Sequence, residues 1–261
     1  MNAPHDLNTI TPTDMTTEEW QARCDLAALY RIVDHFGWTD ILATHMSVRV
    51  PGEPEAFLIN HYEEMFHEIT ASSLIKMSMD GRVLGRQGRF NSAGLTIHSG
   101  VYKARPDVNC VMHTHTRAGA GVSLIRRGLR PISQDVLLVL DEVAYHDYGL
   151  PASADECEAL GVTCQSGNCV VLLNHGLLTC AETVQGALFR MYTLERACEL
   201  ELVSRQLGEP PVMVAPDVVD GIAKAMRKWR LKPDFGLPEW NALLRVIDKK
   251  VNDGKLGDYR I

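Results

Sequence analysis

Two short apolar segments that each end at a histidine constrain the fold of this chain most. Val108 to Met112 runs into His113-Thr114-His115, and Cys169 to Leu173 runs into Asn174-His175-Gly176. Short apolar runs bounded by turn residues are typical of buried strands. The segments around them have helical patterns, at residues 95–104, 118–125, 153–160 and 181–207. Strands that alternate with helices predict a layered α/β fold.

The N-terminal part predicts a helix followed by a β-hairpin. Thr16-Thr17-Glu18-Glu19 has the spacing of a capping box, and an apolar stripe follows it as far as Gly37. Residues 46–50 then alternate with period two, and a second short strand is expected at residues 57–59. Because a hairpin is antiparallel, we expect a mixed rather than an all-parallel sheet.

The rest of the chain adds one more expected strand and two helices. Val136 to Leu140 reads as a buried strand, and residues 218–229 and 239–251 read as helices. Ser153 is a plausible N-cap of a helix that ends at Gly161. The sequence contains neither a repeat nor an internal linker. We therefore predict a flexible arm over residues 1–15 and one domain over residues 16–261.

Charge and cysteine content limit the classes of function. The net charge of this 261-residue chain is −7, which does not favour binding to nucleic acid or to an anionic membrane. The seven cysteines occur without CxxC spacing, and this pattern fits a reducing compartment. The N-terminus has no signal-peptide pattern, and no apolar run approaches the roughly 20 residues of a membrane span. We expect a cytoplasmic protein.

The spacing of three histidines suggests a metal site. His113 and His115 are two residues apart at a strand end, so their side chains project from the same face. If His175 ends a neighbouring strand, the three imidazoles meet at one edge of the sheet and leave coordination positions for water or substrate. A His-x-His pair alone is weak evidence, because hydrogen-bonded structural histidines at strand ends explain it equally well.

Two segments resemble the class II aldolase/adducin family. Residues 98–116, from His98-Ser99-Gly100-Val101-Tyr102 to His113-Thr114-His115-Thr116, are similar to its H-x-x-x-Y-x-x-R-P-D-V-x-x-V-x-H-x-H-[ST] signature. Leu173-Asn174-His175-Gly176-Leu177 resembles its second metal motif. The resemblance covers about residues 20–205. It implies a single-domain three-layer α/β/α fold with a central mixed sheet, and Zn²⁺ or another divalent ion such as Mn²⁺ on His113, His115 and His175. It also implies a homotetramer, with residues 210–261 packing on a neighbouring subunit.

The chain departs from the sugar-phosphate aldolases of this family at two positions. Those enzymes carry a Glu four residues before the position of His98, where this chain has Gly94. Their phosphate-binding turn is replaced by Thr44-His45-Met46-Ser47. Both changes argue against a phosphorylated sugar as substrate. Several segments resemble the adducin head domain instead, at residues 58–60, 67–74, 119–123 and 142–148.

Because Gly94 cannot transfer a proton as the Glu of the aldolases does, other side chains must act as acid or base and bind the substrate. His45, His98 and Tyr148 are the candidate catalytic residues, since imidazole titrates near neutral pH and Tyr148 resembles a substrate-facing tyrosine. Each of these residues can instead have a purely structural role, and for His98 that role is to orient a neighbouring side chain. Arg117, Ser72 and Ser73 are candidates for substrate binding. A guanidinium suits a carboxylate, although a surface salt bridge explains Arg117 equally well.

Three functions compete. The first is a metal-dependent carbon–carbon lyase, aldolase- or decarboxylase-like, that acts on a small oxygenated acid with the metal as the Lewis acid that stabilises an enolate. Decarboxylation does not need a base for a β-hydroxyl proton, so loss of the Glu harms it less than it harms an aldolase. The second is a non-catalytic adducin-like head module with a structural metal and a role in oligomerisation or actin-type cytoskeletal binding. The third is an oxygenase or isomerase with Fe²⁺.

Overall fold

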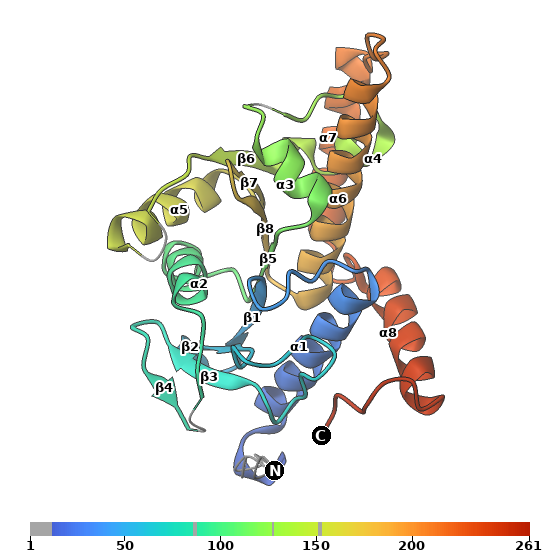
Figure 1. Ribbon diagram of the computed structural model, residues 1–261. Coiled ribbons are helices and arrows are strands. Elements are labelled where there is room, and N and C mark those ends of the chain that lie inside the picture. The colour runs from blue at the N-terminus through green and yellow to red at the C-terminus, as the bar shows by residue number, and fades with distance from the viewer. Residues whose placement is uncertain (1–11, 86–87, 127, 151–152) are drawn as a thin grey trace.

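The computed structural model describes residues 12–85, 88–126, 128–150 and 153–261, and a mixed β-sheet lies at its centre (Figure 1). The described residues form eight strands in the order β4-β3-β2-β1-β5-β8-β7-β6. Only β6 and β7 pair in parallel among them, which confirms the mixed sheet. In chain order the strands are β1 His45–Val50, β2 Glu53–Ile59, β3 Ile75–Ser78, β4 Val83–Leu84, β5 Cys110–Thr114, β6 Val143–His146, β7 Cys169–Leu172 and β8 Gly176–Ala181.

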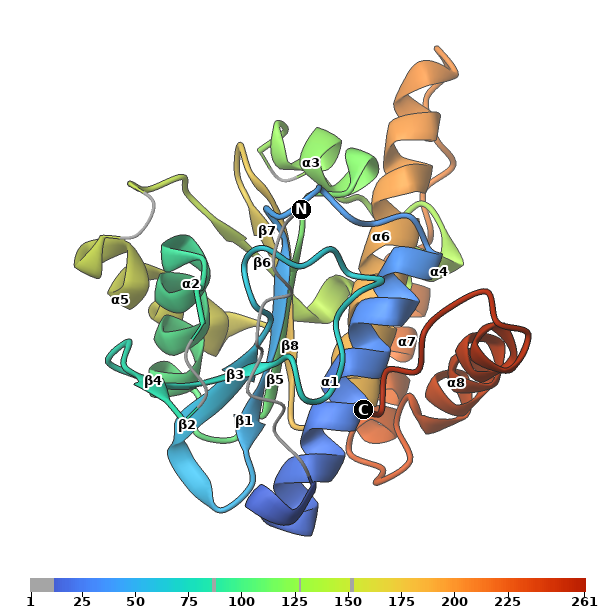
Figure 2. The same cartoon turned by 60° about the horizontal axis from the view of Figure 1, so that its bottom comes forward.

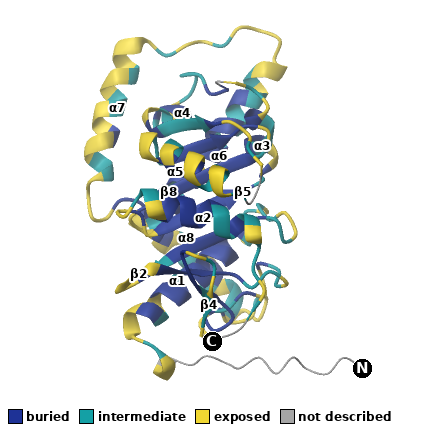
Figure 3. Cartoon of the chain, turned by 90° about the vertical axis from the view of Figure 1, so that its left-hand side faces the viewer, coloured by how far each residue is buried: buried dark blue, intermediate teal, exposed yellow. Residues whose placement is uncertain are grey.

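Helices cover both faces of the sheet and complete three layers (Figures 1 and 2). One face carries α2 (Ser92–Ala104) and α5 (Ala154–Ser166), and their apolar side chains form one core cluster with the sheet. The other face carries α1 (Thr17–His35), α6 (Val184–Gln206) and α8 (Leu237–Asn252), with a second cluster. Neighbouring strand residues such as Val111 and Met112 point into opposite clusters. The sheet is therefore buried on both sides, as Figure 3 shows.

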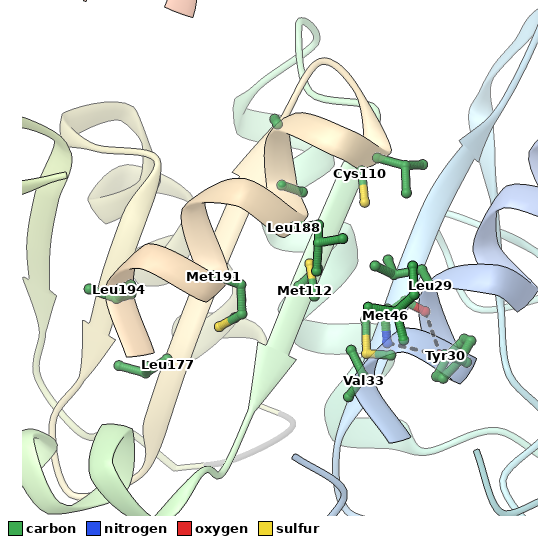
Figure 4. Packing of buried hydrophobic residues seen from close by; sticks show 14 of the residues in the cluster. Leu29, Tyr30, Val33, Met46, Cys110, Met112, Leu177, Leu188, Met191 and Leu194 are labelled. Carbon is green, nitrogen blue, oxygen red and sulfur yellow. Dashed lines mark hydrogen bonds between the residues drawn. The ribbon is translucent and has the colours of Figure 1, made fainter. Parts of the chain in front are cut away.

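The second cluster holds the strand that carries His45. Met46 of β1 packs with Leu29 of α1, and Met112 of β5 packs with Leu188 and Met191 of α6 (Figure 4). The Tyr30 hydroxyl accepts a hydrogen bond from Met46 N at 2.9 Å and donates one to Met46 O at 2.6 Å. A buried tyrosine thus holds the backbone next to His45, and this determines the position from which the His45 side chain projects.

Local capping signals in the sequence match the structure. The Thr16 side chain accepts a hydrogen bond from Glu19 N, and the Ser153 side chain accepts one from Glu156 N. The helix that starts at Ser153 does not end at Gly161 as predicted but continues to Ser166. A Cβ at Gly161 would lie 2.9 Å from Gly100 O, so this glycine lets α5 approach α2 closely.

The strand predicted at Val136–Leu140 is wrong. These residues form the helical turn α4 (Gln134–Leu137) and part of a 3-10 turn at Leu140–Glu142, and strand β6 begins only at Val143. The Ser133 side chain caps α4 by accepting a hydrogen bond from Val136 N. Val136, Leu137 and Val139 are buried in the same cluster as α6. A short apolar run is buried in either conformation, and its pattern alone does not separate the two.

Strand β8 was not predicted, and its presence corrects the expected sheet order. Residues 176–181 follow His175 directly and insert between β5 and β7. The strand that carries His113 and the strand that precedes His175 are therefore not neighbours. His175 still reaches the same sheet edge because it lies in the tight turn that joins β7 to β8, and β8 pairs with β5.

The two ends of the chain differ. Residues 1–11 of the predicted arm lie outside the described residues, and Pro12–Asp14 form a 3-10 turn. The C-terminal tail packs on its own chain, since Ala71 N donates to Tyr259 O at 2.8 Å and Ser72 N donates to Ile261 O at 2.9 Å. The remaining helices are α3 (Arg117–Ser123) and α7 (Pro216–Arg230). Every helix among the described residues is too short or too polar to cross a membrane.

Candidate metal centre

Three imidazoles meet at one edge of the sheet. His113 lies near the end of β5, His115 follows directly after that strand, and His175 lies in the β7–β8 turn. One ring nitrogen of each histidine lies within 4.8 Å of the corresponding atoms of the other two. The three ring centroids are 4.6 to 4.8 Å apart. The predicted convergence of these side chains is therefore present in the structure.

The β7–β8 turn has a backbone shape that few residues adopt. Asn174 has φ of 59°, in the left-handed region that asparagine tolerates better than most other residues. A Cβ at Gly176 would lie only 2.4 Å from Thr114 O, so the close approach of the turn to β5 requires a glycine. Asn174 and Gly176 together bring His175 against the strand that carries His113.

The outer nitrogens of two rings are held by acceptors. His113 Nδ1 lies 2.9 Å from Leu177 O, and His115 Nδ1 lies 2.9 Å from Asp40 Oδ2. A carbonyl or carboxylate oxygen only accepts, so each Nδ1 carries a proton, and in a neutral ring the Nε2 atom keeps a lone pair. This tautomer is the one that binds metals through Nε2.

The donor set fits a divalent ion. The Nε2 atoms of His113 and His115 lie 2.8 Å apart. Two nitrogens on a tetrahedral zinc, at about 2.0–2.1 Å each, lie about 3.3 Å apart, so a small rotation of the rings accommodates the ion. Burial and the neighbouring imidazoles, His45 first, lower the pKa of His113 well below 6.5. Burial and His115 lower the pKa of His175 to about 4. Neutral imidazoles are the form that coordinates metals.

A second group of histidines lies beside the first. His45 faces His113 across the β1–β5 pairing, and their ring centroids are 5.0 Å apart. His45 Nδ1 lies 2.7 Å from His98 Nε2, and His98 Nδ1 lies 2.6 Å from Ser47 Oγ. Ser47 Oγ in turn lies 2.8 Å from the Tyr102 hydroxyl. All four side chains are buried.

This four-residue chain of hydrogen bonds keeps one nitrogen free for chemistry. If His45 Nδ1 donates to His98 Nε2, His98 Nδ1 donates to Ser47 and His45 Nε2 is a proton acceptor. Burial, together with His98, lowers the pKa of His45 well below 6.5, and burial with His113 lowers the pKa of His98 to about 3. Both rings are therefore neutral at pH 7, and in this tautomer His45 can accept a proton on Nε2.

Gly94 and His45 occupy complementary space. A Cβ at Gly94 would lie 3.1 Å from Cδ2 of His45 and 3.3 Å from its Nε2. A long acidic side chain at position 94 would therefore displace the imidazole. Positions 45 and 94, at which the sequence departs from the aldolases, face each other in the fold, and His45 lies next to the three-histidine cluster.

The comparisons with known proteins agree with this geometry. Residues 24–202 match the family model described as the class II aldolase and adducin N-terminal domain. The chain belongs to the class II aldolase/adducin family. It is 40% identical to a Pseudomonas aeruginosa protein named for the class 2 aldolases, over 96% of this chain and 98% of that one. It is 38% identical to rat alpha-adducin, over 87% of this chain but only 33% of the adducin.

Solved structures in the family have the same fold. An aldolase II superfamily protein from Pseudomonas syringae superimposes with a TM-score of 0.87 at 36% identity, over 95% of this chain and 98% of that one. The L-fuculose 1-phosphate aldolase of Glaciozyma antarctica superimposes with a TM-score of 0.81 at 26% identity, over 97% and 98% of the two chains. The predicted three-layer fold with a central mixed sheet is therefore confirmed.

The other candidate residues lie at different distances from the cluster. The Tyr148 ring is 57% exposed and stands perpendicular to His175, with centroids 6.2 Å apart. Arg117 is exposed at the start of α3, two residues after His115. Ser72 and Ser73 lie in the loop before β3, two strands from β1; Ser72 N bonds to the C-terminal tail and Ser73 Oγ donates to Thr70 O. Only Tyr148 joins the histidine cluster directly.

Sequence reasoning missed several polar groups around the site. Ser47 and Tyr102 have a signal, because they lie two residues after His45 on a strand and four residues after His98 on a helix, on the same faces. Asp40 lies in a loop 75 residues before its partner His115, and spacing gives no indication of it. His146 and Glu156 line a cavity beside His175, and their spacing in the sequence gives no indication of it either.

Proposed function

We propose that this protein is a metal-dependent carbon–carbon lyase, aldolase- or decarboxylase-like, that acts on a small oxygenated acid. The proposed metal ligands are His113, His115 and His175, and the ion is Zn²⁺ or another divalent ion such as Mn²⁺. The observation that carries the proposal is the convergence of three imidazole nitrogens within 4.8 Å, with a fourth imidazole, His45, facing the group. His115 and His175 are half-buried, which leaves a side from which a substrate can approach.

The chemistry divides between the ion and the protein. A divalent ion supplies Lewis-acid stabilisation of negative charge on a carbonyl or hydroxyl oxygen. His45 Nε2 is the proposed base: burial holds the pKa of His45 well below 6.5, and we propose the tautomer in which its Nδ1 donates to His98 and its Nε2 keeps a lone pair. In aldol cleavage it takes the hydroxyl proton and returns it to the carbon that loses its bond partner. In decarboxylation that carbon takes a proton that enters from solvent after CO₂ leaves.

The other candidate residues take supporting roles in the proposal. His98 is a positioning residue, because Ser47 and Tyr102 fix its ring and it fixes His45. Tyr148 stands beside His175, and Arg117 is exposed two residues after His115; we propose that both contact the substrate. Ser72 and Ser73 contribute to substrate binding only if a larger substrate extends across two strands of the sheet edge.

The proposed context is a cytoplasmic homotetramer. The seven cysteines, all within the described residues, are free thiols, and this supports a reducing compartment. The family includes fuculose-phosphate aldolases, whose fold this chain shares. We propose that this chain assembles as a homotetramer, with α7 and α8 as the elements nearest to a neighbouring subunit.

The decisive experiment measures metal content and turnover together. Wild type and His113→Ala are purified without chelator, analysed for metal, and tested on β-keto acids, hydroxy-aromatic acids and aldol acids. We expect about one zinc or manganese per chain in the wild type, its loss in the variant, and metal-dependent release of CO₂ or an aldehyde. The matched control is His67→Ala, an exposed histidine in the β2–β3 loop, which should keep both properties. Metal-free wild-type protein would overturn the proposal.

A second candidate function is a non-catalytic adducin-like head module. The 38% identity to rat alpha-adducin and the absence of a side chain at Gly94 favour it. The two functions differ in the coordination shell of the ion. Water proton relaxation in the Mn²⁺-loaded protein would detect exchangeable water for a lyase. A closed shell with no turnover on any acid would support the module.

A further inference from the structure

A cavity of about 80 Å³ adjoins the candidate metal centre. His175 forms part of its wall, and Tyr148 lies beside that histidine. Most of the remaining wall is apolar and comes from α2, α5 and the end of β7, with Ile97, Leu160 and Leu172 among its side chains. We call this cavity the tail pocket. His175 thus belongs both to the three-histidine cluster and to the wall of this cavity.

One polar pair lies in the wall of the tail pocket. His146 Nε2 lies 3.1 Å from Glu156 Oε1, and His146 Nδ1 lies 2.9 Å from Thr163 Oγ1. The Thr163 hydroxyl donates its hydrogen to Ala159 O, so it accepts from His146 Nδ1. The side chains of Thr163 and Glu156 thus hold the two ring nitrogens of His146.

The lining of the tail pocket does not favour an anion. None of the described residues that line it is a lysine or an arginine, and the lining includes Asp147 and Glu156. A phosphate or a second carboxylate in this space would lose hydration without a charged partner. A hydroxyl group is compatible, because the Glu156 carboxyl can accept its hydrogen.

The size of the tail pocket limits the ligand further. A cavity of about 150 Å³ holds benzene, so about 80 Å³ holds roughly half of that ring, on the order of three non-hydrogen atoms. An aromatic ring does not fit without displacement of the apolar wall. A short aliphatic group does.

We infer that the tail pocket binds the end of the substrate that is remote from the metal, and that this end is a short, uncharged aliphatic group with a terminal hydroxyl. This inference rests on the proposed function and narrows its substrate class to short-chain aliphatic oxygenated acids. Phosphorylated and aromatic acids are excluded from this pocket. The apolar wall selects for the length of the chain, and Glu156 selects for the hydroxyl.

The test compares acids that differ only in their tails. Acetate, butanoate, 4-hydroxybutanoate, phenylacetate and 3-phosphonopropanoate are titrated into metal-loaded wild-type protein by calorimetry. We expect 4-hydroxybutanoate to bind at least about tenfold more tightly than phenylacetate or the phosphonate. Equal or tighter binding of the phosphonate would overturn the inference.

Two variants with matched controls locate the effect. Ala93→Leu places extra atoms in the tail pocket and should weaken 4-hydroxybutanoate binding about tenfold while leaving acetate unchanged; Ser92→Leu, one exposed residue away, should change neither. Glu156→Gln should reduce the advantage of 4-hydroxybutanoate over butanoate about three- to tenfold, the range of one hydrogen bond. Glu158→Gln, exposed on the same helix, should not reduce it. Equal weakening of acetate and 4-hydroxybutanoate by Ala93→Leu would contradict a separate pocket.

A metal-independent measurement separates this inference from the proposed function. In His113→Ala protein, 1-propanol should shift the methyl NMR signals of Ile97, Leu160 and Leu172, and benzyl alcohol should not. If the methyl signals shift in His113→Ala but the wild type turns over no acid, the tail pocket is supported and the lyase proposal is contradicted. If the wild type turns over an acid but these methyl signals do not shift in His113→Ala, the tail pocket is contradicted and the lyase proposal is supported.

Discussion

The two groups of histidines at this sheet edge differ in where their nitrogens point. In the metal group, His113 and His115 give their outer nitrogens to Leu177 O and Asp40, so the inner lone pairs converge. In the buried group, His45 and His98 bond to each other and to Ser47, so only one imidazole nitrogen, His45 Nε2, is left for another partner. Convergent lone pairs suit a cation, and a single free nitrogen at the end of a hydrogen-bonded chain suits a proton.

The largest expected effect tests this division directly. His45→Gln removes the proposed base and should lower turnover of the acid identified in the panel by about 10²- to 10⁴-fold, the contribution of a general base. Metal content should remain about one ion per chain, because His45 is not among the three proposed ligands. Steady-state kinetics and elemental analysis on the same preparation check both statements. Loss of the metal together with activity would mean that the two groups of histidines are one site.

The second effect concerns stability and belongs to the metal group alone. An ion present at 100 times its dissociation constant stabilises the folded state by about 2.7 kcal/mol. For a chain of this size that corresponds to a Tm change of about 5–10 °C. A chelator should therefore lower the Tm of the wild type and of His45→Gln by this amount, as followed by circular dichroism. His113→Ala should start at the lower Tm and show no response to the chelator.

The sequence predicts some features of the metal group and of the fold, but it does not predict the strand order. His113 and His115 could be paired because period two holds along any strand, and the caps at Thr16 and Ser153 depend only on local spacing. The resemblance to the family placed His175 with them. The strand order could not be derived, because β8 directly follows the turn at His175 and its apolar residues merge with the start of the next helix.

The buried group and the cavity depend on contacts between distant segments. Gly94 was identified as a departure, but only the fold shows that His45 fills the space in front of it. Asp40 reaches His115 from a loop that has no regular pattern. The pair of His146 and Glu156 forms across a strand and a helix ten residues apart, where spacing rules for a single element do not apply.

The third effect is a pH dependence to which His98 of the buried group contributes. Burial holds the pKa of His98 at about 3 in the folded state, below its ordinary value of 6.5. Between these two pH values the unfolded state binds more protons than the folded state. The free energy of unfolding is therefore unaffected by this group above pH 6.5 and decreases as the pH falls from 6.5 toward 3. The loss for a fully buried histidine amounts to about 2 kcal/mol at pH 5.

Urea unfolding between pH 7.5 and 4.5, in the presence of chelator, measures this dependence. His98→Asn should be less stable at pH 7.5 but should have a shallower slope, because one titrating group is gone. His67→Asn, at an exposed position, should keep the wild-type slope. An unchanged slope in His98→Asn would show that His98 is not neutral in the folded protein at these pH values.

The smallest expected effect sharpens the account of the metal group. Asp40 Oδ2 accepts the hydrogen bond from His115 Nδ1 and so keeps the lone pair of Nε2 directed toward the cluster. Asp40→Asn keeps an acceptor but loses its charge, and it should weaken metal affinity about tenfold; Asp40→Ala should approach a 100-fold loss. Competition with a chromogenic chelator gives the affinity without any need for turnover. Asp234→Asn, exposed in the α7–α8 connection, is the matched control. If Asp40→Asn and Asp40→Ala bind metal as tightly as the wild type, the bond to Asp40 does not orient His115, and Leu177 O on His113 remains as the positioning contact.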